Sequence, residues 1–333
     1  MVGLAEFFER KPNIEVVVFA GKGGLGKTTS SAALSYHMAV NEGKKVLCFS
    51  TDPQASLSDI FERDLFGKGV VEVAPNLYVV EIDADRKIAE YQQEIKQRIL
   101  DMYGLEELPK EIEEYIDSTS AEPAMYESAT YDAMADLVAS GEYDLYVFDM
   151  PPFGHGVRMV AMAEILSAWV DKITEARKEA AEYEAVAATL KGGMQTEDMV
   201  LKELEEIRKK MTTFTELMTN SEKTAFFMVM VPEKMAILDT ERALEMFREL
   251  NIEMSGVVVN QIYPRDLLDK PDLPELLRKK IEMQENHLME IRDKFGDLVA
   301  ALIPMYDREP KGLGMIAKVA EDLMHSRRDL LWW

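Results

Sequence analysis

Residues 21–29 read GKGGLGKTT and match the pattern G-x-x-x-x-G-K-[ST]. The run lies between a short apolar, β-branched stretch, Val16–Ala20, and a segment of helix-forming composition that extends from Thr28 to about Ala39. Glycines let the backbone wrap closely around phosphate oxygens with its N–H groups turned inward, and the following helix adds its positive N-terminal end. A strand, this loop and a helix in that order predict a nucleotide phosphate site.

The rest of the chain repeats the order strand, loop, helix. Short apolar runs, each followed by turn or helix-cap residues, are typical of parallel strands buried on both faces. We therefore expect an α/β fold, a P-loop NTPase with a mainly parallel sheet flanked by helices and an inserted α-helical subdomain. The further predicted strands are Val46–Ser50, Leu77–Ile82, Leu145–Phe148, Ala225–Val231, Met254–Val259 and Leu298–Ile303.

Two stretches show no strand signal and are expected to be helical. Residues 1–333 are accordingly interpreted as one α/β nucleotide-binding domain with a core of about 1–85, 141–156 and 221–333 and helical insertions at about 86–140 and 157–220. The second insertion is expected to contain two long helices that meet at Gly192-Gly193. The last segment, Met315–Trp333, is interpreted as a terminal helix that closes the core, with a membrane-touching tail as the alternative.

Composition limits the partners and the compartment. The chain carries 38 Lys+Arg against 61 Asp+Glu, a net charge of −23, which disfavours nucleic acid and stable docking on anionic lipid. One cysteine excludes a disulfide framework and a four-cysteine zinc site within the chain. Since we find neither a long apolar run nor a basic-then-apolar signal segment, we expect a cytoplasmic protein with no nucleic-acid partner.

Charged and hydroxyl residues near the loop predict Mg-dependent hydrolysis of a nucleoside triphosphate. Lys27 is expected to reach the β- and γ-phosphates, while the Thr28 hydroxyl and Asp149, which follows an apolar strand, hold Mg²⁺. Asp52 follows the second strand and is expected to orient or deprotonate the attacking water; a simple turn at Asp52-Pro53 is the alternative. The loop residues expected to bind the nucleotide are Gly23, Gly24, Leu25, Gly26, Lys27, Thr28 and Thr29.

Lys22 adds information because an ordinary phosphate loop needs no lysine at its second position. The run from Lys22 to Thr29 resembles the deviant Walker A loop of the ParA/MinD/ArsA/Get3/nitrogenase-iron-protein group. In that group the extra lysine crosses a dimer interface to the partner's nucleotide. The resemblance therefore implies a homodimer in which Lys22, together with Lys27, neutralises phosphate charge during catalysis.

The second switch narrows the resemblance to the ArsA/Get3 family, whose members are ATPases. From the family's pattern Asp-Thr-Ala-Pro-Thr-Gly-His-Thr-x-Arg this chain keeps Asp149, Pro152, Gly154, His155 and Arg158. The first switch, residues 52–59, is also similar. The resemblance implies that ATP is the nucleotide, that Asn260 reads the adenine edge, and that Pro304 begins the loop that covers the base.

The scarcity of cysteines helps to distinguish between zinc-binding, arsenite-dependent and other functions within this family. Eukaryotic Get3 proteins share zinc through a Cys-x-x-Cys pair, but the corresponding stretch, about Tyr263 to Phe295, has no cysteine, so no zinc is expected. A soft metalloid needs clustered thiolates, and Cys48 is the single thiol. The resemblance then favours a Get3-like carrier or targeting factor for tail-anchored or other membrane-protein helices, with a membrane receptor as a further partner. The alternatives are an arsenite-pump-driving ATPase subunit of the ArsA type or a ParA/MinD-like positional regulator.

An apolar stripe in the second insertion supports two interpretations. In a Get3-like dimer such stripes line a groove that shields the hydrophobic transmembrane segment of a client, and flexible methionine side chains suit that task. An amphipathic helix that packs on the core shows the same stripe. The residues predicted to line the groove are Met199, Leu204, Met211, Phe214 and Met218.

Overall fold

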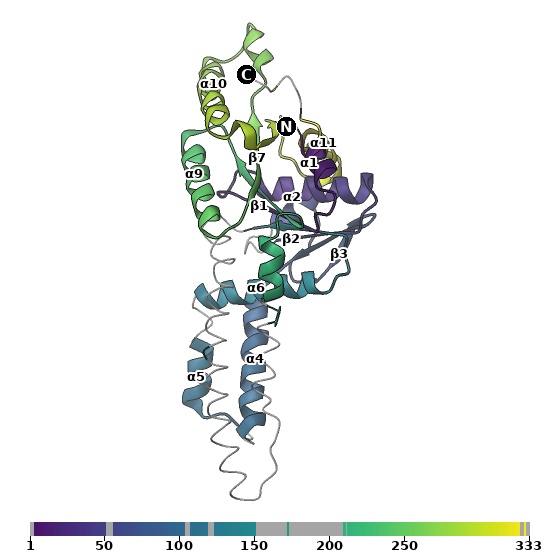
Figure 1. The fold of residues 1–333 in the computed structure, drawn as a ribbon, viewed down its shortest axis with the longest axis vertical. Helices are drawn as coiled ribbons and strands as arrows, with labels where there is room; N and C mark the ends of the chain where they lie inside the picture. The colour runs from purple at the N-terminus through teal and green to yellow at the C-terminus, as the bar shows by residue number, and fades with distance from the viewer. Residues whose placement is uncertain are drawn as a thin grey trace, which may run out of the picture.

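The computed structural model describes residues 3–50, 56–103, 107–118, 123–150, 172, 209–210, 212–326 and 330. Figure 1 labels most of the elements. The strands are β1 (Val16–Ala20), β2 (Val46–Ser50), β3 (Val71–Ala74), β4 (Leu77–Glu81), β5 (Leu145–Asp149), β6 (Thr224–Met230), β7 (Met254–Ile262) and β8 (Val299–Pro304). The α-helices are α1 (Leu4–Arg10), α2 (Lys27–Tyr36), α3 (Ser56–Phe61), α4 (Ala84–Tyr103), α5 (Lys110–Ser118), α6 (Pro123–Ala139), α9 (Lys234–Glu249), α10 (Glu275–Phe295) and α11 (Gly312–Met324). Short helices of other types are η1 (His37–Asn41), η3 (Arg265–Asp269) and η4 (Gly296–Leu298).

The described strands form one eight-stranded sheet in the order β3-β4-β2-β5-β1-β6-β7-β8. Every neighbouring pair from β4 to β8 is parallel, and β3 runs antiparallel to β4 at one edge. β1, which leads into the phosphate loop, lies between β5 and β6 near the middle of the sheet. The predicted α/β fold with a mainly parallel sheet is confirmed.

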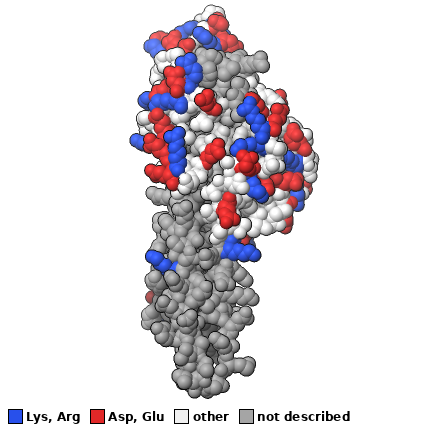
Figure 2. All heavy atoms as spheres, viewed as in Figure 1, with Lys and Arg blue, Asp and Glu red and all other residues white. Residues whose placement is uncertain are grey.

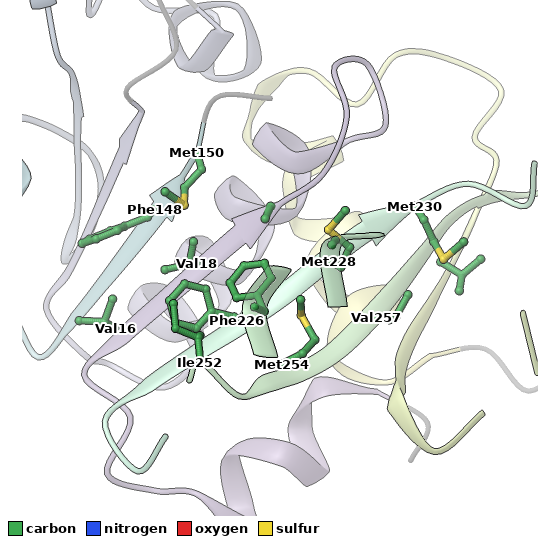
Figure 3. Close-up of a cluster of buried hydrophobic side chains, with 14 of the residues drawn as sticks. Val16, Val18, Phe148, Met150, Phe226, Met228, Met230, Ile252, Met254 and Val257 are labelled. Atoms are coloured by element: carbon green, nitrogen blue, oxygen red, sulfur yellow. The ribbon is translucent and has the colours of Figure 1, made fainter. Parts of the chain in front are cut away.

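Helices cover both faces of the sheet. Side chains alternate along β1, so that Val17 and Phe19 pack with α1, α2, α3 and α11, whereas Val16 and Val18 pack with α6, α9 and α10. Figure 3 shows part of the second layer, in which Val16 and Val18 lie beside Phe148 of β5 and Phe226 of β6. Burial on both faces explains why β1, β2 and β5 are continuous apolar runs.

Among the described residues, three helices lie between β4 and β5, where the sequence shows no strand signal. Helices α4 and α5 extend away from the sheet in Figure 1. Lys96 of α4 joins them, because its Nζ lies 2.8 Å from Asp117 Oδ1 and 3.3 Å from Glu113 Oε1 on α5. The division into a core and two insertions stays a prediction, and the Gly192-Gly193 corner lies outside the described residues.

The chain differs from the predicted pattern at two short elements. β3 was not predicted, since it has four residues, lies at the sheet edge and has one buried side chain, Val73. The helix after the phosphate loop continues past Tyr36 as the π-helix η1 rather than as a regular helix. At the other end, α11 begins at Gly312 and ends at Met324, well before the predicted end at Trp333. It packs on the sheet with Ile316, Val319 and Leu323 fully buried, as a helix that closes the core should.

The charged residues on one face of the α/β part are mixed by sign (Figure 2). On the face shown in Figure 2, Lys and Arg side chains alternate with Asp and Glu over the α/β part. That face therefore offers no continuous basic patch of the kind that phosphate backbones attract. Within the described part of the chain, no helix has the length and apolar character that a membrane span requires.

Candidate functional site

The loop between β1 and α2 has the backbone conformation of a phosphate cradle. Gly24 has φ 80° and Gly26, the residue before α2, has φ 99°, both in the left-handed region that favours glycine. A Cβ atom on Gly26 would lie only 2.1 Å from Asn260 Nδ2, whereas one on Gly24 would meet no atom within 4 Å. Glycine at position 26 is thus required both by conformation and by a neighbour on β7.

Lys27 extends its side chain back along this loop. Lys27 is 6% exposed, and its Nζ donates a hydrogen bond to the backbone oxygen of Lys22 at 3.3 Å. The ammonium group therefore lies beside the loop backbone at the N-terminus of α2, where both the helix dipole and the lysine favour an anion. This position agrees with the predicted contact to the phosphates, which stays a prediction.

A buried carboxylate lies beside the start of α2. Asp149 ends β5, is 1% exposed, and pairs in register with Phe19 of β1 and Ser50 of β2. Its Oδ2 accepts hydrogen bonds from Thr28 Oγ1 at 2.8 Å and from Ser50 Oγ at 3.1 Å, and Ser56 Oγ lies 3.5 Å away. Parallel strands bring these residues together because their carboxyl ends meet at one sheet edge.

The donor set at this edge fits magnesium. A carboxylate and a hydroxyl are hard oxygen ligands of the kind that Mg²⁺ prefers, and Thr28 and Asp149 supply them within hydrogen-bond distance of each other. These two residues would hold the ion, which would offset the negative charge of the bound phosphates. Elsewhere, the described residues contain no group of three or more His, Cys, Asp or Glu side chains arranged to hold a metal.

Asn260 supports the phosphate loop from β7. Its Nδ2 donates to the backbone oxygen of Leu25 at 2.8 Å, and its Oδ1 accepts from the backbone N–H of Gln261 at 2.8 Å. Pro304 ends the neighbouring strand β8, where Met305 N donates to Ile262 O at 2.8 Å. Asn260 therefore contacts the loop, and Pro304 lies at the end of the strand beside β7. Their contacts with adenine stay predictions.

Lys22 points toward α9. Its Nζ lies 3.6 Å from Asp239 Oδ2, and the second oxygen of Asp239 is 3.9 Å from Arg242 Nη1. The Lys22 side chain is 58% exposed, which makes this an exposed ion pair on the surface. The family resemblance assigns this lysine to the nucleotide of a second subunit. In this structure it is ion-paired to Asp239 of its own chain.

Several predicted residues lie outside the described part of the structure. These are Asp52, the second-switch residues Pro152, Gly154, His155 and Arg158, and the groove residues Met199, Leu204 and Met211. The two groove residues that the structure describes are buried: Phe214 is 5% and Met218 is 2% exposed. The ring of Phe214 packs edge-on against Tyr131, with centroids 4.9 Å apart, so these two residues pack on the core, as the alternative interpretation expects.

Sequence reasoning missed polar residues that act through other segments. Ser50 and Glu81 each end an apolar strand, as Asp149 does, and the structure places all three on adjacent strands at the carboxyl edge. Their position at a strand end is the signal that could have identified them. The run Asp239-Thr240-Glu241-Arg242 resembles the family's sequence, but nothing in it indicates the contact between Asp239 and Lys22, because the two residues are distant in the chain.

The single thiol is inaccessible. Cys48 lies in the middle of β2 with 0% exposure, and burial raises the pKa of its thiol to about 12. A thiol that stays protonated is neither a metal ligand nor a nucleophile at neutral pH.

Known proteins are similar in sequence to this chain over most of its length. A sequence profile of the anion-transporting ATPases, ArsA_ATPase, matches residues 14–325. A protein named putative arsenical pump-driving ATPase 2 from Aquifex aeolicus is 29% identical over 301 residues, which cover 90% of this chain and 95% of that protein.

Relatives with a second kind of name match over a similar share of the chain. ATPase ASNA1 homolog 2 from Paramecium tetraurelia is 24% identical over 94% of both chains. ATPase GET3 from Malassezia globosa is 27% identical over 94% of this chain and 92% of its own. With the phosphate loop after β1 and the carboxylate at the end of β5, these matches show that the chain belongs to the ArsA family of anion-transporting ATPases and hydrolyses ATP.

Proposed function

We propose that this ATPase works as a nucleotide-switched homodimer in which Lys22 of each subunit contacts the ATP bound to the other. The exposure of Lys22 supports the proposal, because a side chain that is 58% exposed is accessible to a second chain. Its ion pair with Asp239 does not prevent Lys22 from leaving Asp239 for the other subunit's ATP, since an exposed ion pair stabilises a protein by only about 0–1 kcal/mol.

Within each subunit we assign the chemistry to the residues around the loop. Lys27 contacts the β- and γ-phosphates, Thr28 and Asp149 hold Mg²⁺, and Asp52 orients the attacking water. Asn260 and Pro304 contact the adenine. The 2.8 Å hydrogen bond between Thr28 and Asp149 carries this assignment, because it joins the first helical turn to the carboxyl end of the neighbouring strand.

We propose further that the dimer is a Get3-like carrier for tail-anchored or other membrane-protein helices, which it delivers to a membrane receptor. The observation that favours this role over a metalloid-driven one is the state of Cys48. It is the single cysteine in the chain, it is fully buried, and its pKa is about 12, so no set of thiolates is available for arsenite.

A role in driving an arsenical pump is the second candidate. The names of the Aquifex aeolicus relatives favour it, since both are named putative arsenical pump-driving ATPases. The two candidates differ in the ligand that changes the ATPase rate, which is a membrane-protein helix in one and an oxyanion in the other.

Two measurements separate these candidates. The protein is co-expressed with a tagged tail-anchored segment and purified without detergent, and its ATPase rate is measured with and without arsenite. Recovery of a soluble complex with the segment and an arsenite-independent rate support the carrier. A rate that rises with arsenite, without recovery of the complex, would overturn it.

The homodimer is tested with Lys22→Ala and with Lys279→Ala as the control, because Lys279 is similarly exposed and ion-paired to Glu275 at 2.7 Å. We expect Lys22→Ala to lose turnover by about 100-fold or more while it still binds ATP. Lys279→Ala should hydrolyse ATP at the wild-type rate. Undiminished hydrolysis by Lys22→Ala would count against a shared site.

A further inference from the structure

Asn260 contacts the phosphate loop from a strand outside it. Its Nδ2 donates a hydrogen bond to Leu25 O at 2.8 Å, and a Cβ atom on the next residue, Gly26, would collide with the same nitrogen. Asn260 is 8% exposed, so the contact is buried. Four of the nine residues in the run 21–29 are glycines, and a backbone so rich in glycine has many conformations to choose from. A contact from outside the loop therefore helps to select one of them.

The carbonyl oxygens of the loop need donors other than the nucleotide. When the N–H groups of such a loop turn toward an anion, its carbonyl oxygens turn away from it. Gly26 O accepts hydrogen bonds from the N–H and the hydroxyl of Ser30, both at 2.9 Å, and Lys22 O accepts from Lys27 Nζ. These donors belong to α2, the helix that continues the loop. Asn260 belongs instead to β7, so it ties the loop to the sheet.

The end of β7 fixes the direction of the Asn260 side chain. Gln261 has φ 57°, in the left-handed region that residues other than glycine seldom adopt, and the pairing of β7 with β8 shifts its register here. Asn260 Oδ1 accepts from Gln261 N at 2.8 Å. Gln284 of α10 accepts from the N–H of Tyr263 at 2.9 Å and donates to its carbonyl oxygen at 3.1 Å. Irregularities of this kind redirect side chains beside functional sites, and here the contacts on both sides hold the irregular turn in place.

The two hydrogen bonds of the Asn260 amide leave it capacity for a further ligand. If the amide were turned by 180°, Oδ1 would face the carbonyl oxygen of Leu25 and Nδ2 would face the N–H of Gln261, so both contacts select the same orientation. Together they use one N–H group and one lone pair. The edge of an adenine requires one donor and one acceptor, and an amide has two of each. The same side chain can therefore bind the loop and a base at once.

We propose that Asn260 is a positioning residue for the triphosphate, in addition to the base contact proposed above: by holding Leu25 O, it keeps the loop in the conformation that binds phosphates. The inference rests on the proposed binding of the ATP phosphates in this loop. It assigns part of the affinity for the triphosphate to a residue that acts through the backbone of Leu25. The base site and the phosphate site are then linked through one amide.

Inorganic tripolyphosphate tests this role because it has phosphates and no base. Dissociation constants for its magnesium complex and for a non-hydrolysable ATP analogue are measured by calorimetry in wild type, Asn260→Ala and Asn251→Ala. Asn251 is the matched control, since it is exposed, precedes the opposite end of β7 and also has a positive φ, 55°. Loss of one hydrogen bond to the loop should weaken the binding of tripolyphosphate about fivefold in Asn260→Ala. The ATP analogue should be weakened further, because its base contact is lost as well. Asn251→Ala should bind both ligands as wild type does.

A role confined to the base predicts a different pattern. Asn260→Ala would then bind the ATP analogue more weakly but tripolyphosphate with the wild-type dissociation constant, and that outcome overturns the inference. Equal losses in Asn260→Ala and Asn251→Ala also overturn it, because they indicate a general loss of stability. If Asn260→Ala fails to fold, Asn260→Leu takes its place, since leucine has a similar size and no hydrogen-bond donor.

Adenosine, which has the base and no phosphate, separates this inference from the proposed function. We expect Asn260→Ala to bind adenosine more weakly than wild type does. Unchanged adenosine binding with weakened tripolyphosphate binding would overturn the proposed base contact and support the role in the loop. If wild type binds adenosine but not tripolyphosphate, the proposed phosphate site and the inference both fail.

Discussion

Lys22 Nζ lies 3.6 Å from Asp239 Oδ2 in the same chain. The lysine that we assign to a second subunit's nucleotide therefore forms an ion pair within its own subunit. Release of this pair accompanies any contact of Lys22 with another chain. In Asp239→Asn the release costs less, and we expect the dimer formed with a non-hydrolysable ATP analogue to dissociate two- to fivefold less readily, as about 0.5–1 kcal/mol implies.

Sedimentation at low and at high salt checks this effect. The difference from wild type should shrink at high salt, where exposed charges are screened. Glu275→Gln, which removes the partner of the exposed Lys279, serves as the control and should leave the dissociation constant unchanged. Equal dissociation constants for Asp239→Asn and wild type at every salt concentration would refute the competition between Asp239 and the second subunit.

Asp149→Asn should abolish Mg-dependent hydrolysis. The amide keeps the size of the side chain but loses the charge that binds the cation, so we expect kcat to fall by at least about 100-fold and the Mg²⁺ requirement to rise. A magnesium titration of the ATPase rate measures both quantities. Asp144→Asn, just before the opposite end of β5 and exposed, should behave as wild type, and equal losses in the two variants would argue against a specific ligand.

Gly26→Ala should weaken ATP binding more than Gly24→Ala does. Both positions have positive φ, so each substitution strains the backbone by about 1–3 kcal/mol. Only at Gly26 does the new Cβ also meet Asn260 Nδ2, at 2.1 Å. Calorimetric dissociation constants for ATP measure the difference, and equal values in the two variants would show that Asn260 moves aside without consequence.

Cys48 should be unreactive while the protein is folded. Burial raises its pKa to about 12, so at pH 8 only about one thiol in ten thousand is ionised, and the side chain is also out of reach of the solvent. Labelling with an alkylating reagent, followed by mass spectrometry, should show no adduct in buffer and complete modification in denaturant. Rapid labelling of the native protein would mean that β2 opens readily.

His37 should make the protein less stable in mild acid. Burial is the largest influence and lowers its pKa below the ordinary 6.5; His325 acts in the same direction, whereas Glu42 and Glu321 oppose it. The unfolded state therefore takes up the proton first, and the free energy of unfolding falls as the pH drops below about 6.5, by at most about 1.4 kcal/mol per pH unit.

Urea titrations between pH 7 and pH 5 measure this dependence. We expect His37→Gln to reduce the slope relative to wild type over the range just below pH 6.5. His287→Gln, at a half-buried position of α10, is the control and should leave the slope unchanged. Identical slopes for His37→Gln and wild type would show that His37 does not cause the loss of stability in mild acid.

The sequence predicted the strands that are buried on both faces and missed the one that is not. Val16–Ala20 and Val46–Ser50 were predicted with the bounds that the structure gives, because a continuous apolar run has few other interpretations next to a glycine loop. β3 alternates weakly and lies at an edge, so its four residues resemble a loop. Similarly, the meeting of Thr28 and Asp149 follows from parallel strands that end at one edge.

The contacts of Glu81 and Asp239 were not predictable in this way. Glu81 binds backbone N–H groups of α3, and such groups leave no pattern of residue types in the sequence. Asp239 meets Lys22 only because α9, which follows the neighbour of β1 in the sheet, brings it beside the loop. Sequence motifs identify residues that recur at set spacings. Contacts such as those of Glu81 and Asp239 depend instead on how separate segments of the chain pack together.

The position of β1 between β5 and β6 has a consequence for synthesis of the protein. Val16 pairs with Tyr146 on one side and with Thr224 on the other, so the strand that precedes the phosphate loop completes its neighbours only after most of the chain has been made. Contacts between such distant segments form slowly. A ribosome-bound fragment that ends before β6 should therefore hold ATP poorly, and nucleotide capture becomes a late event that marks a finished subunit.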